Sequence, residues 1–288
     1  MTKIAIASCC KIEGKYHVKN QTAWREIEDE TPDILLLLGD NVYMKQSRPR
    51  WNFPHLEEQY KKQFKEPHFY SLINKVPFMA TWDDHDFGPN NSRGATSDGI
   101  KGGRRDKSRK LFHKYMKDSI NDNRPEVYCT HIINNIKIIM LDVRYYRNAA
   151  GRRNSTILGD NQEKWLKKEL DHKHKFTIVC SGVGFGEKNR GNRDDWSAYE
   201  YASKRLEAEL NKIPKLFFVA GDIHSNKFKK HGKFYEVHSS GVGRKHRGDR
   251  KPLNNYGIID YGSNSVKISL KGRNKINKEI RISDWKLI

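Results

Sequence analysis

Short apolar segments alternate with amphipathic segments along most of the chain. The apolar runs have the length of buried strands and occupy residues 4–7, 33–38, 76–81, 176–180 and 215–220. The amphipathic segments have the period of a helix and occupy residues 22–30, 56–73, 107–117, 160–170 and 196–210. This alternation predicts an α/β protein built of layers.

Further strands are predicted in two regions. Residues 127–133 and 137–141 flank Asn134-Asn135, a pair that is typical of a β-hairpin turn. After residue 232 the pattern is of strands alone, at residues 234–238, 257–261 and 266–270. No repeat, low-complexity tract or linker divides the sequence. We therefore expect a single domain over residues 1–288.

Composition narrows the class of protein. Of the 288 residues, 36% are hydrophobic and 31% are charged, and the 6 Trp, 13 Tyr and 12 Phe argue against a disordered chain. The longest aliphatic run, residues 34–38, is too short to span a bilayer. The N-terminus begins with a strand-like segment and has no signal-peptide pattern. We expect a cytoplasmic protein without a transmembrane segment, in which Cys129 and Cys180 are buried and all four cysteines are reduced.

Positive charge is concentrated in two segments. The formal net charge is +20; residues 101–117 carry eight Lys or Arg and one acid, and residues 227–251 carry nine and two. If the segments meet in space, their field would attract phosphate-bearing ligands. Charge alone does not distinguish nucleic acid, anionic lipid and small phosphate esters, and a solvated basic surface would give the same pattern.

Polar clusters follow directly after several predicted strands. They are Ser8-Cys9, Gly39-Asp40-Asn41-Val42-Tyr43, Trp82-Asp83-Asp84-His85-Asp86-Phe87-Gly88 and Gly221-Asp222-Ile223-His224. Ligands of open α/β sheets bind at the carboxyl ends of strands, so we expect these clusters to converge on one crevice. Crowded carboxylates raise one another's pKa unless a cation is bound, which indicates a metal site. Two metal ions there would orient a phosphate and lower the pKa of a bridging water.

Taken singly, most of these clusters are weak signals. Gly-Asp after a strand is also common turn chemistry. The segment of residues 82–86 is more informative, because three acids and a histidine after an apolar strand have little structural use. Histidines outside the clusters are expected to be surface or packing residues; these are His17, His55, His68, His113, His172 and His174.

The ordered motifs resemble those of the PhoD-like alkaline phosphatases, a branch of the calcineurin-like metallophosphoesterase superfamily. The resemblance runs through nearly the whole chain. Besides the four clusters, it includes Asn90, Leu141-Asp142-Val143-Arg144, Leu158-Gly159 with Gln162 and Trp165-Leu166, Asp194-Asp195-Trp196 with Tyr199, and Glu236 with Ser239-Ser240-Gly241.

This resemblance implies a two-layer β-sandwich flanked by helices, a metallophosphatase-like fold with a two-metal site. Asp40 would bridge the metals, and Cys9 and Tyr43 would complete a ferric-type centre of an enzyme that uses Fe³⁺ with Ca²⁺, although other divalent metals would also be compatible. The remaining candidate ligands are Asp84, Asn90, Asp222 and His224.

The resemblance also suggests catalytic residues. Either Asp83 or Asp84 could bind metal, and alignment with the Gly-Asn-His-Glu motif of the wider superfamily favours Asp84. His85 would then stabilise the phosphoryl group or protonate the leaving oxygen. Arg144 would clamp phosphate oxygens or, equally, form a structural ion pair with Asp142 or Asp195. Asp194 and Asp195 would support the ligands or cap the helix at Trp196.

The chain departs from the secreted members of the family. We see no export signal, no additional N-terminal β domain and no C-terminal lid helix, because residues 255–288 have the pattern of strands and polar turns. Val242-Gly243-Arg244-Lys245-His246 stands where the family usually has Thr-His. An open, basic mouth of the site is therefore expected.

Three functions remain at this stage. The leading hypothesis is a metal-dependent phosphoesterase that hydrolyses phosphate monoesters or diesters with a metal-activated hydroxide. The alternative is a phosphodiesterase that acts on a polyanion such as nucleic acid or phospholipid. The weakest is a non-catalytic basic module that binds nucleic acid. The sequence leaves the substrate and the oligomeric state open.

Overall fold

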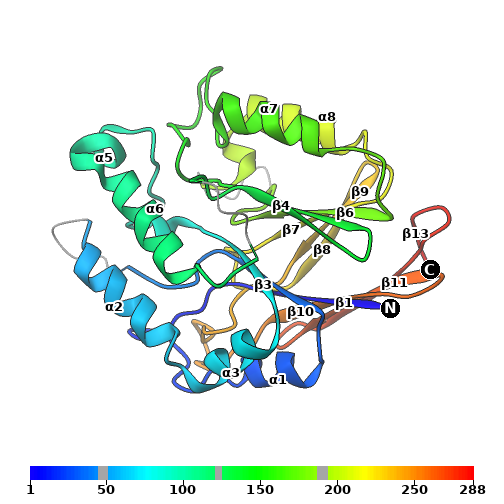
Figure 1. Ribbon diagram of the computed structural model, residues 1–288, viewed down its shortest axis with the longest axis horizontal. Coiled ribbons are helices and arrows are strands. Elements are labelled where there is room, and N and C mark those ends of the chain that lie inside the picture. The colour runs from blue at the N-terminus through cyan, green and yellow to red at the C-terminus, as the bar shows by residue number, and fades with distance from the viewer. Residues whose placement is uncertain (45–50, 121–124, 187–193) are drawn as a thin grey trace.

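The layers of the fold follow from strands that are apolar on both faces. The computed structural model describes residues 1–44, 51–120, 125–186 and 194–288. Two β-sheets pack face to face, and helices cover the outer face of each sheet, as Figure 1 shows. The predicted two-layer sandwich flanked by helices is confirmed.

The first sheet combines a parallel half and an antiparallel half. Its strand order in the described residues is β13 (Lys286–Leu287), β12 (Ile276–Arg281), β11 (Ser265–Lys271), β10 (Tyr256–Tyr261), β1 (Thr2–Ala7), β2 (Ile34–Leu38) and β3 (Phe78–Thr81). β1, β2 and β3 are parallel, with Ala7 opposite Leu37 and Leu38 opposite Thr81. Their carboxyl ends therefore lie at the same edge.

The second sheet has a parallel centre with an antiparallel strand at each side. Its order in the described residues is β4 (Cys129–Ile133), β5 (Ile136–Met140), β6 (Phe176–Ser181), β7 (Leu216–Ala220), β9 (Phe234–His238) and β8 (Lys227–His231). The predicted hairpin is confirmed as β4 and β5, and Asn134 and Asn135 both have the positive φ that a two-residue hairpin turn favours. β8 was not predicted, because its charged sequence lacks an apolar run.

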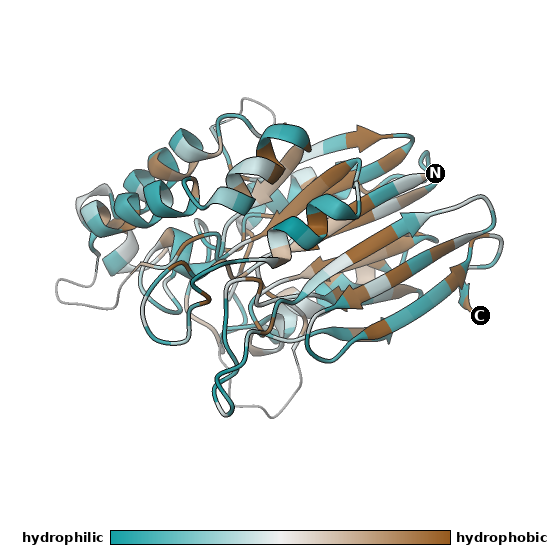
Figure 2. Cartoon of the chain, turned by 90° about the horizontal axis from the view of Figure 1, so that it is seen from below, coloured by the Kyte–Doolittle hydropathy of each residue, from teal (hydrophilic) through white to brown (hydrophobic). Residues whose placement is uncertain are grey.

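Alternate residues of the central strands serve different cores. Ile4 and Ile6 point between the sheets, where they join Phe217 and Val219, whereas Ala5 packs under the helices outside the first sheet. In Figure 2 much of the brown colour of apolar residues lies in the strands, whereas the helices are largely teal. Burial of both faces explains why these strands appear as continuous apolar runs in the sequence.

The helices divide between the two outer faces. α1 (Ala23–Asp29), α2 (Phe53–Gln63), α3 (Pro67–Lys75) and α6 (Arg104–Tyr115) contribute to the core outside the first sheet, and α7 (Gly159–Glu169) and α8 (Glu200–Leu210) to that outside the second. Shorter elements are α4 (Asp84–Phe87), α5 (Ser97–Ile100), η1 (Lys101–Gly103) and η2 (Trp196–Ala198).

Two predicted helices are divided. The segment 56–73 forms α2 and α3, because Glu66 caps a new helix by accepting from the Phe69 amide at 2.7 Å and Pro67 occupies its first position. The segment 196–210 begins as η2 and becomes α-helical only at Glu200. In both cases the predicted residues are helical but the break was not foreseen.

Candidate metal centre

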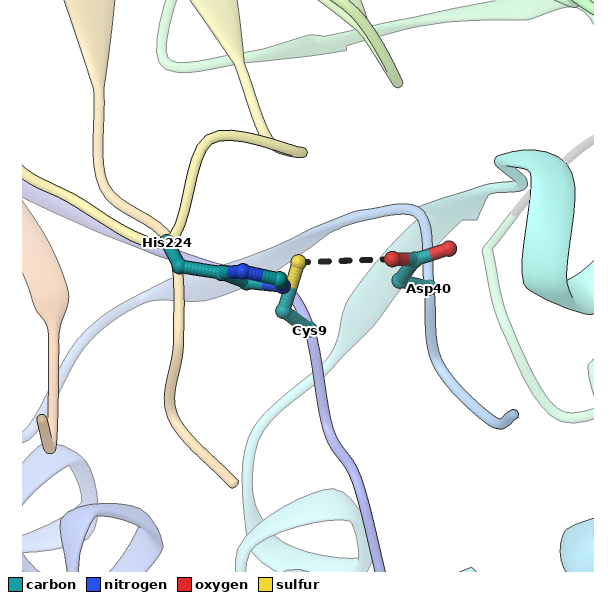
Figure 3. Close-up of side chains that lie close together, drawn as sticks. All are labelled: Cys9, Asp40 and His224. Atoms are coloured by element: carbon teal, nitrogen blue, oxygen red, sulfur yellow. Dashed lines mark hydrogen bonds between the residues drawn. The ribbon is translucent and has the colours of Figure 1, made fainter. Parts of the chain in front are cut away.

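Side chains that follow the carboxyl ends of three strands meet in one place. Cys9 follows β1, Asp40 follows β2, and His224 lies four residues after β7. Atoms of these three side chains that could bind a metal all lie within 4.8 Å of one another. Figure 3 shows Cys9 and His224 directed toward each other, with Asp40 beside the thiol. The predicted convergence of the strand-end clusters is therefore present.

Asp40 belongs to two such groups. Its carboxylate also lies within 4.8 Å of Asp84 and His85, which begin α4 after β3. Oδ2 of Asp40 accepts from the Cys9 thiol at 3.5 Å, and Oδ1 accepts from the His85 amide at 3.2 Å. A carboxylate with one oxygen toward each group has the geometry of a ligand shared by two cations.

The backbone at this site adopts conformations that side chains other than glycine usually avoid. Cys9, Asp40, Asp222 and His224 have φ values of 61°, 52°, 66° and 50°. Left-handed backbone at non-glycine residues is uncommon and costs free energy, and it is concentrated at functional sites. Because this conformation costs free energy at four candidate ligands, it indicates a functional site and not a contribution to stability.

Tyr43 and His85 form the side of the centre that faces a pocket. The Tyr43 hydroxyl is 3.3 Å from Nε2 of His224, and its ring centroid is 4.3 Å from that of His85. Nδ1 of His85 is buried and has no hydrogen-bond partner among the described residues. An orphaned buried nitrogen is costly in a folded protein, so this atom has the environment expected of a group that meets a ligand.

Asp83 and Asp84 have different surroundings. Oδ1 of Asp83 accepts from Nε of Arg144 at 2.7 Å, and Asp83 is fully buried. Oδ2 of Asp84 accepts from the Asn91 amide at 2.6 Å, and Asp84 is the one that lies in a group with Asp40. The geometry therefore supports Asp84 as the candidate ligand and gives Asp83 to the arginine.

Arg144 is enclosed by acids of the protein. Its Nη1 and Nη2 reach the two oxygens of Asp194 at 3.0 and 2.6 Å, and its exposed fraction is 0%. Every guanidinium nitrogen has a protein acceptor, namely Asp83, Asp194 or the carbonyl of Ser92. The ion pair is thus formed with Asp83 and Asp194 and not with the side chains of Asp142 or Asp195. Sequence reasoning named Asp142 and Asp195 instead, because residue type alone does not distinguish Asp194 from Asp195 and because Asp83 lies 61 positions from Arg144.

Two further candidates lie at the margin of the centre. Asn90 is exposed, lines the pocket, and donates its side-chain amide to Asn91 at 2.8 Å. Asp222 is partly exposed, and its carbonyl oxygen lies 3.9 Å from the Cys9 sulfur. The carboxylate of Asp222 is in neither of the two groups formed around Asp40. If Asn90 and Asp222 are ligands, the metal ion must also lie within reach of oxygen atoms outside those two groups.

The electrostatics of the acids are those of a site built for cations. Burial and the nearby carboxylates of Asp84 and Asp83 raise the pKa of Asp40 well above its ordinary value. Burial and Asp84 raise the pKa of Asp222 to about 7. Burial acts in the same direction on Asp84, but the charges of His85 and Arg144 outweigh it and lower its pKa. A bound cation would remove the repulsion between these groups.

Burial also disfavours charge on the other candidate ligands. Burial and Asp40 raise the pKa of the Cys9 thiol and of the Tyr43 phenol, and Ser240 donates to the Cys9 sulfur at 3.1 Å. Burial and Arg244 lower the pKa of His224, which favours the neutral imidazole that binds metals. Thiol, phenol, imidazole and carboxylate donors within one cluster fit a transition metal, and the additional carboxylate oxygens fit a harder ion.

A pocket of about 440 Å³ opens beside the centre. Tyr43, His85 and Asn90 line it, and so do Lys11 and Arg244, which give it a basic wall. The expected basic mouth is therefore present. Lys11 was not predicted as a site residue, although it lies two residues after Cys9.

Comparisons with known proteins agree with this fold. The family model described as PhoD-like phosphatase matches residues 4–244. A search of curated protein sequences gave no significant match. Among solved structures, PhoD is similar at 16% identity and a TM-score of 0.78, covering 100% of this chain and 71% of that one. A dimetal phosphatase from Danio rerio is similar at 11% identity and a TM-score of 0.61, with 96% and 98% covered. GAP50 of Plasmodium, an anchor in the inner membrane complex, has 10% identity and a TM-score of 0.58, with 100% and 86% covered.

The fold and the clustered ligands define a metallophosphatase-like protein. The match over most of the sequence is more specific: the chain belongs to the PhoD-like phosphatase family. Membership implies a hydrolase of phosphoric esters and supports a site for more than one metal ion. Within the described ranges, every helix is too short or too polar to span a bilayer.

Proposed function

We propose that this protein hydrolyses phosphate monoesters or diesters at a two-metal site bridged by Asp40. The observation that carries the proposal is the shared carboxylate of Asp40, which lies in one group with Cys9 and His224 and in another with Asp84 and His85. Metal ions bound at such a pair of sites orient a phosphate, offset its charge and lower the pKa of a coordinated water.

The donors divide by chemical type. Cys9, Tyr43 and His224 lie on one side of Asp40 and would hold a ferric ion, because thiolate, phenolate and imidazole suit a transition metal. Asp84, with Asn90 and Asp222, would hold calcium through oxygen atoms. Other divalent ions could replace either one, so the metal content of the purified protein is part of the test.

His85 would act directly on the substrate. Its ring lines the pocket, and its Nδ1 has no protein partner within the described residues. Burial lowers the pKa of His85, so the imidazole is neutral at physiological pH and retains one N–H to donate. A proton held at Nδ1 would stabilise a phosphoryl oxygen or pass to the leaving oxygen. Arg144 would support Asp83 and α4, and with them Asp84, from behind.

The test is hydrolysis by protein of measured metal content. Initial rates with p-nitrophenyl phosphate and with bis-p-nitrophenyl phosphate should depend on metal, and Asp84→Ala should abolish both. Asp260→Ala, a change of a partly exposed acid opposite Lys3 near the amino end of β1 and so away from the site, is the matched control and should retain the activity. Metal-free protein that hydrolyses neither substrate after metal is supplied would refute the proposal.

The basic pocket wall favours a second candidate, a phosphodiesterase of polyanions such as nucleic acid. A faster rate with the bis-ester than with the monoester, and cleavage of a single-stranded oligonucleotide, would support it. A non-catalytic module would instead bind the oligonucleotide equally well with and without Asp84 and release no product.

A further inference from the structure

Lys11 and Arg244 form a pair of like charges over one aromatic ring. Nζ of Lys11 lies 5.4 Å from the centroid of Tyr43, and Cζ of Arg244 lies 5.3 Å from the same centroid. Tyr43 is itself a candidate ligand 3.3 Å from His224. Both cations therefore lie within one side chain of the metal centre, and both line the pocket that opens from it.

Neither cation forms an ion pair with another described residue. Among the residues that the structure describes, no carboxylate oxygen comes within 4.0 Å of Nζ of Lys11 or of the Arg244 guanidinium. Arg244 is only 7% exposed, and its Nε is buried without a hydrogen-bond partner in the described parts. The acid that lines the same pocket, Glu13, is occupied by Lys62 and Gln59, each at 2.6 Å.

The backbone holds this pair in position. Gly243 donates to the carbonyl of Cys9 at 3.1 Å, and a Cβ at Gly243 would lie 2.5 Å from the amide nitrogen of Lys11. The amide of Leu253 donates to the carbonyl of Arg244 at 2.8 Å, and Arg244 also forms a β-bridge with His17. The close approach that glycine permits brings two cations from opposite ends of the chain together before any ligand binds.

We propose that Lys11 and Arg244 form a second anion-binding subsite, which selects phosphate esters that carry a second phosphate group. A buried arginine with an unpartnered Nε beside a lysine is costly without an anion, and a guanidinium matches the oxygens of a phosphate. This inference rests on the proposed function: one phosphate would occupy the metal centre, and the second would lie between Lys11 and Arg244. The substrate class is a bisphosphate, either a small molecule or the end of a nucleic-acid strand.

Steady-state kinetics with a matched substrate pair test the inference. We expect kcat/KM for adenosine 3′,5′-bisphosphate to exceed that for adenosine 5′-monophosphate, and Arg244→Gln to reduce this ratio by about tenfold or more, mainly through KM. Arg247→Gln removes the same charge from the same loop, but its side chain is exposed and does not line the pocket. It should leave the ratio within about twofold.

Three results would overturn the inference. An equal loss of kcat/KM for both substrates in Arg244→Gln would make Arg244 a structural partner of Tyr43. An equal fall of the substrate ratio in Arg247→Gln would mean that the overall positive charge, and not a specific subsite, selects the bisphosphate. A wild-type ratio near one would exclude selection altogether. A 5′-phosphorylated oligonucleotide that competes more strongly than the small bisphosphate would identify a nucleic-acid end as the source of the second phosphate.

A binding measurement separates this inference from the proposed function. Calorimetry of the 288-residue chain with adenosine 3′,5′-bisphosphate, with chelator present to stop turnover, reports the subsite without catalysis. Weaker binding by Arg244→Gln and by Lys11→Gln, but not by Arg247→Gln, would support the subsite even if no ester were hydrolysed. Equal affinity in all four proteins would refute it even if hydrolysis were observed.

Discussion

The Cys9 thiol and the Asp40 carboxylate lie 3.5 Å apart, although the two residues are thirty-one positions apart in the sequence and α1 lies between their strands. They meet because β1 and β2 are parallel neighbours, so that the residues after Ala7 and after Leu38 leave the sheet at the same edge. Cys9 and Asp40 both have left-handed backbone, and the thiol of one points toward the carboxylate of the other, as Figure 3 shows. The following predictions test what this arrangement does.

Replacement of Asp40 by Asn should separate metal binding from folding. Asn tolerates the left-handed backbone at position 40 and can still accept from the His85 amide. We expect a loss of metal and at least about a 100-fold loss of hydrolysis, since even indirect partners of metal ligands matter by 10–100-fold. With chelator present, the variant should be more stable than the wild type at neutral pH, by about 1 kcal/mol or more, because the raised pKa of Asp40 reflects a destabilising buried charge. Thermal unfolding with and without chelator measures both effects, and a variant less stable than wild type in chelator would contradict this account.

Replacement of Cys9 by serine should change the metal content, whereas the same replacement of the adjacent Cys10 should not. Cys9 faces Asp40 and Ser240, whereas Cys10 packs in the core outside the first sheet. We expect Cys9→Ser to lower the ratio of transition metal to calcium, because a hydroxyl is a harder donor than a thiol. Cys10→Ser should leave that ratio unchanged and cost only packing stability. Metal analysis of both proteins by mass spectrometry is the measurement, and equal ratios in the two variants would remove Cys9 from the ligand set.

Arg144 should prove to be a positioning residue. Arg144→Ala would remove the arginine that pairs with the buried acids Asp83 and Asp194, of which Asp194 keeps Arg147 at 3.1 Å, and should cost about 3–5 kcal/mol. Asp194→Asn should destabilise in the same way, while Arg109→Ala, at a partly exposed ion pair, should cost less than about 1 kcal/mol. Denaturant unfolding gives these values. Full stability of Arg144→Ala together with a raised KM would instead establish a phosphate clamp.

Glu236 should make the free energy of unfolding depend on pH. Its carboxylate lies 2.8 Å from Nε2 of His231 and 2.9 Å from Nε2 of His238, and it accepts from the Phe185 amide at 2.7 Å. Burial acts to raise its pKa, but the hydrogen bonds from His231 and His238 outweigh it and hold the pKa of Glu236 below its ordinary value of 4.5. The folded state therefore binds this proton less readily than the unfolded chain. The stabilisation is present above about pH 4.5 and is lost as pH falls below that value.

Glu236→Gln measures this contribution. At pH 7 the variant should be less stable by about 2 kcal/mol, and the difference from wild type should shrink as the pH approaches 3. Glu209→Gln, which alters a partly exposed pair with Lys212, should change stability by less than about 1 kcal/mol at either pH. A difference for Glu236→Gln that is the same at pH 3 and pH 7 would show that the effect is one of packing.

Much of the layered fold was predictable from sequence because the information is local. Leu36 and Leu38 face the space between the sheets while Leu35 and Leu37 face the helices, so β2 has no polar position and appears as an unbroken apolar run. The breaks within the helices were less visible, since they depend on how Glu66 and Pro67 start a new helix. β8 was missed because most of its residues are charged and all are at least partly exposed, so its sequence has no apolar run. Its backbone pairing with β9, which the sequence pattern does not reveal, makes it a strand.

The candidate ligands were likewise predictable as residue types, because acids, a thiol and histidines directly after buried strands have few structural uses. Contacts between distant segments depended on the tertiary structure. Asp83 and Asp84 are adjacent and chemically identical, yet Arg144, which follows β5 and is itself held by Asp194, donates only to Asp83. The pairing of Lys11 with Arg244, 233 positions apart, arises only where Gly243 lets two backbones touch. Local sequence patterns specify which elements form and which donors they carry; which donor meets which partner is decided by packing between elements, and that information is spread over the whole chain.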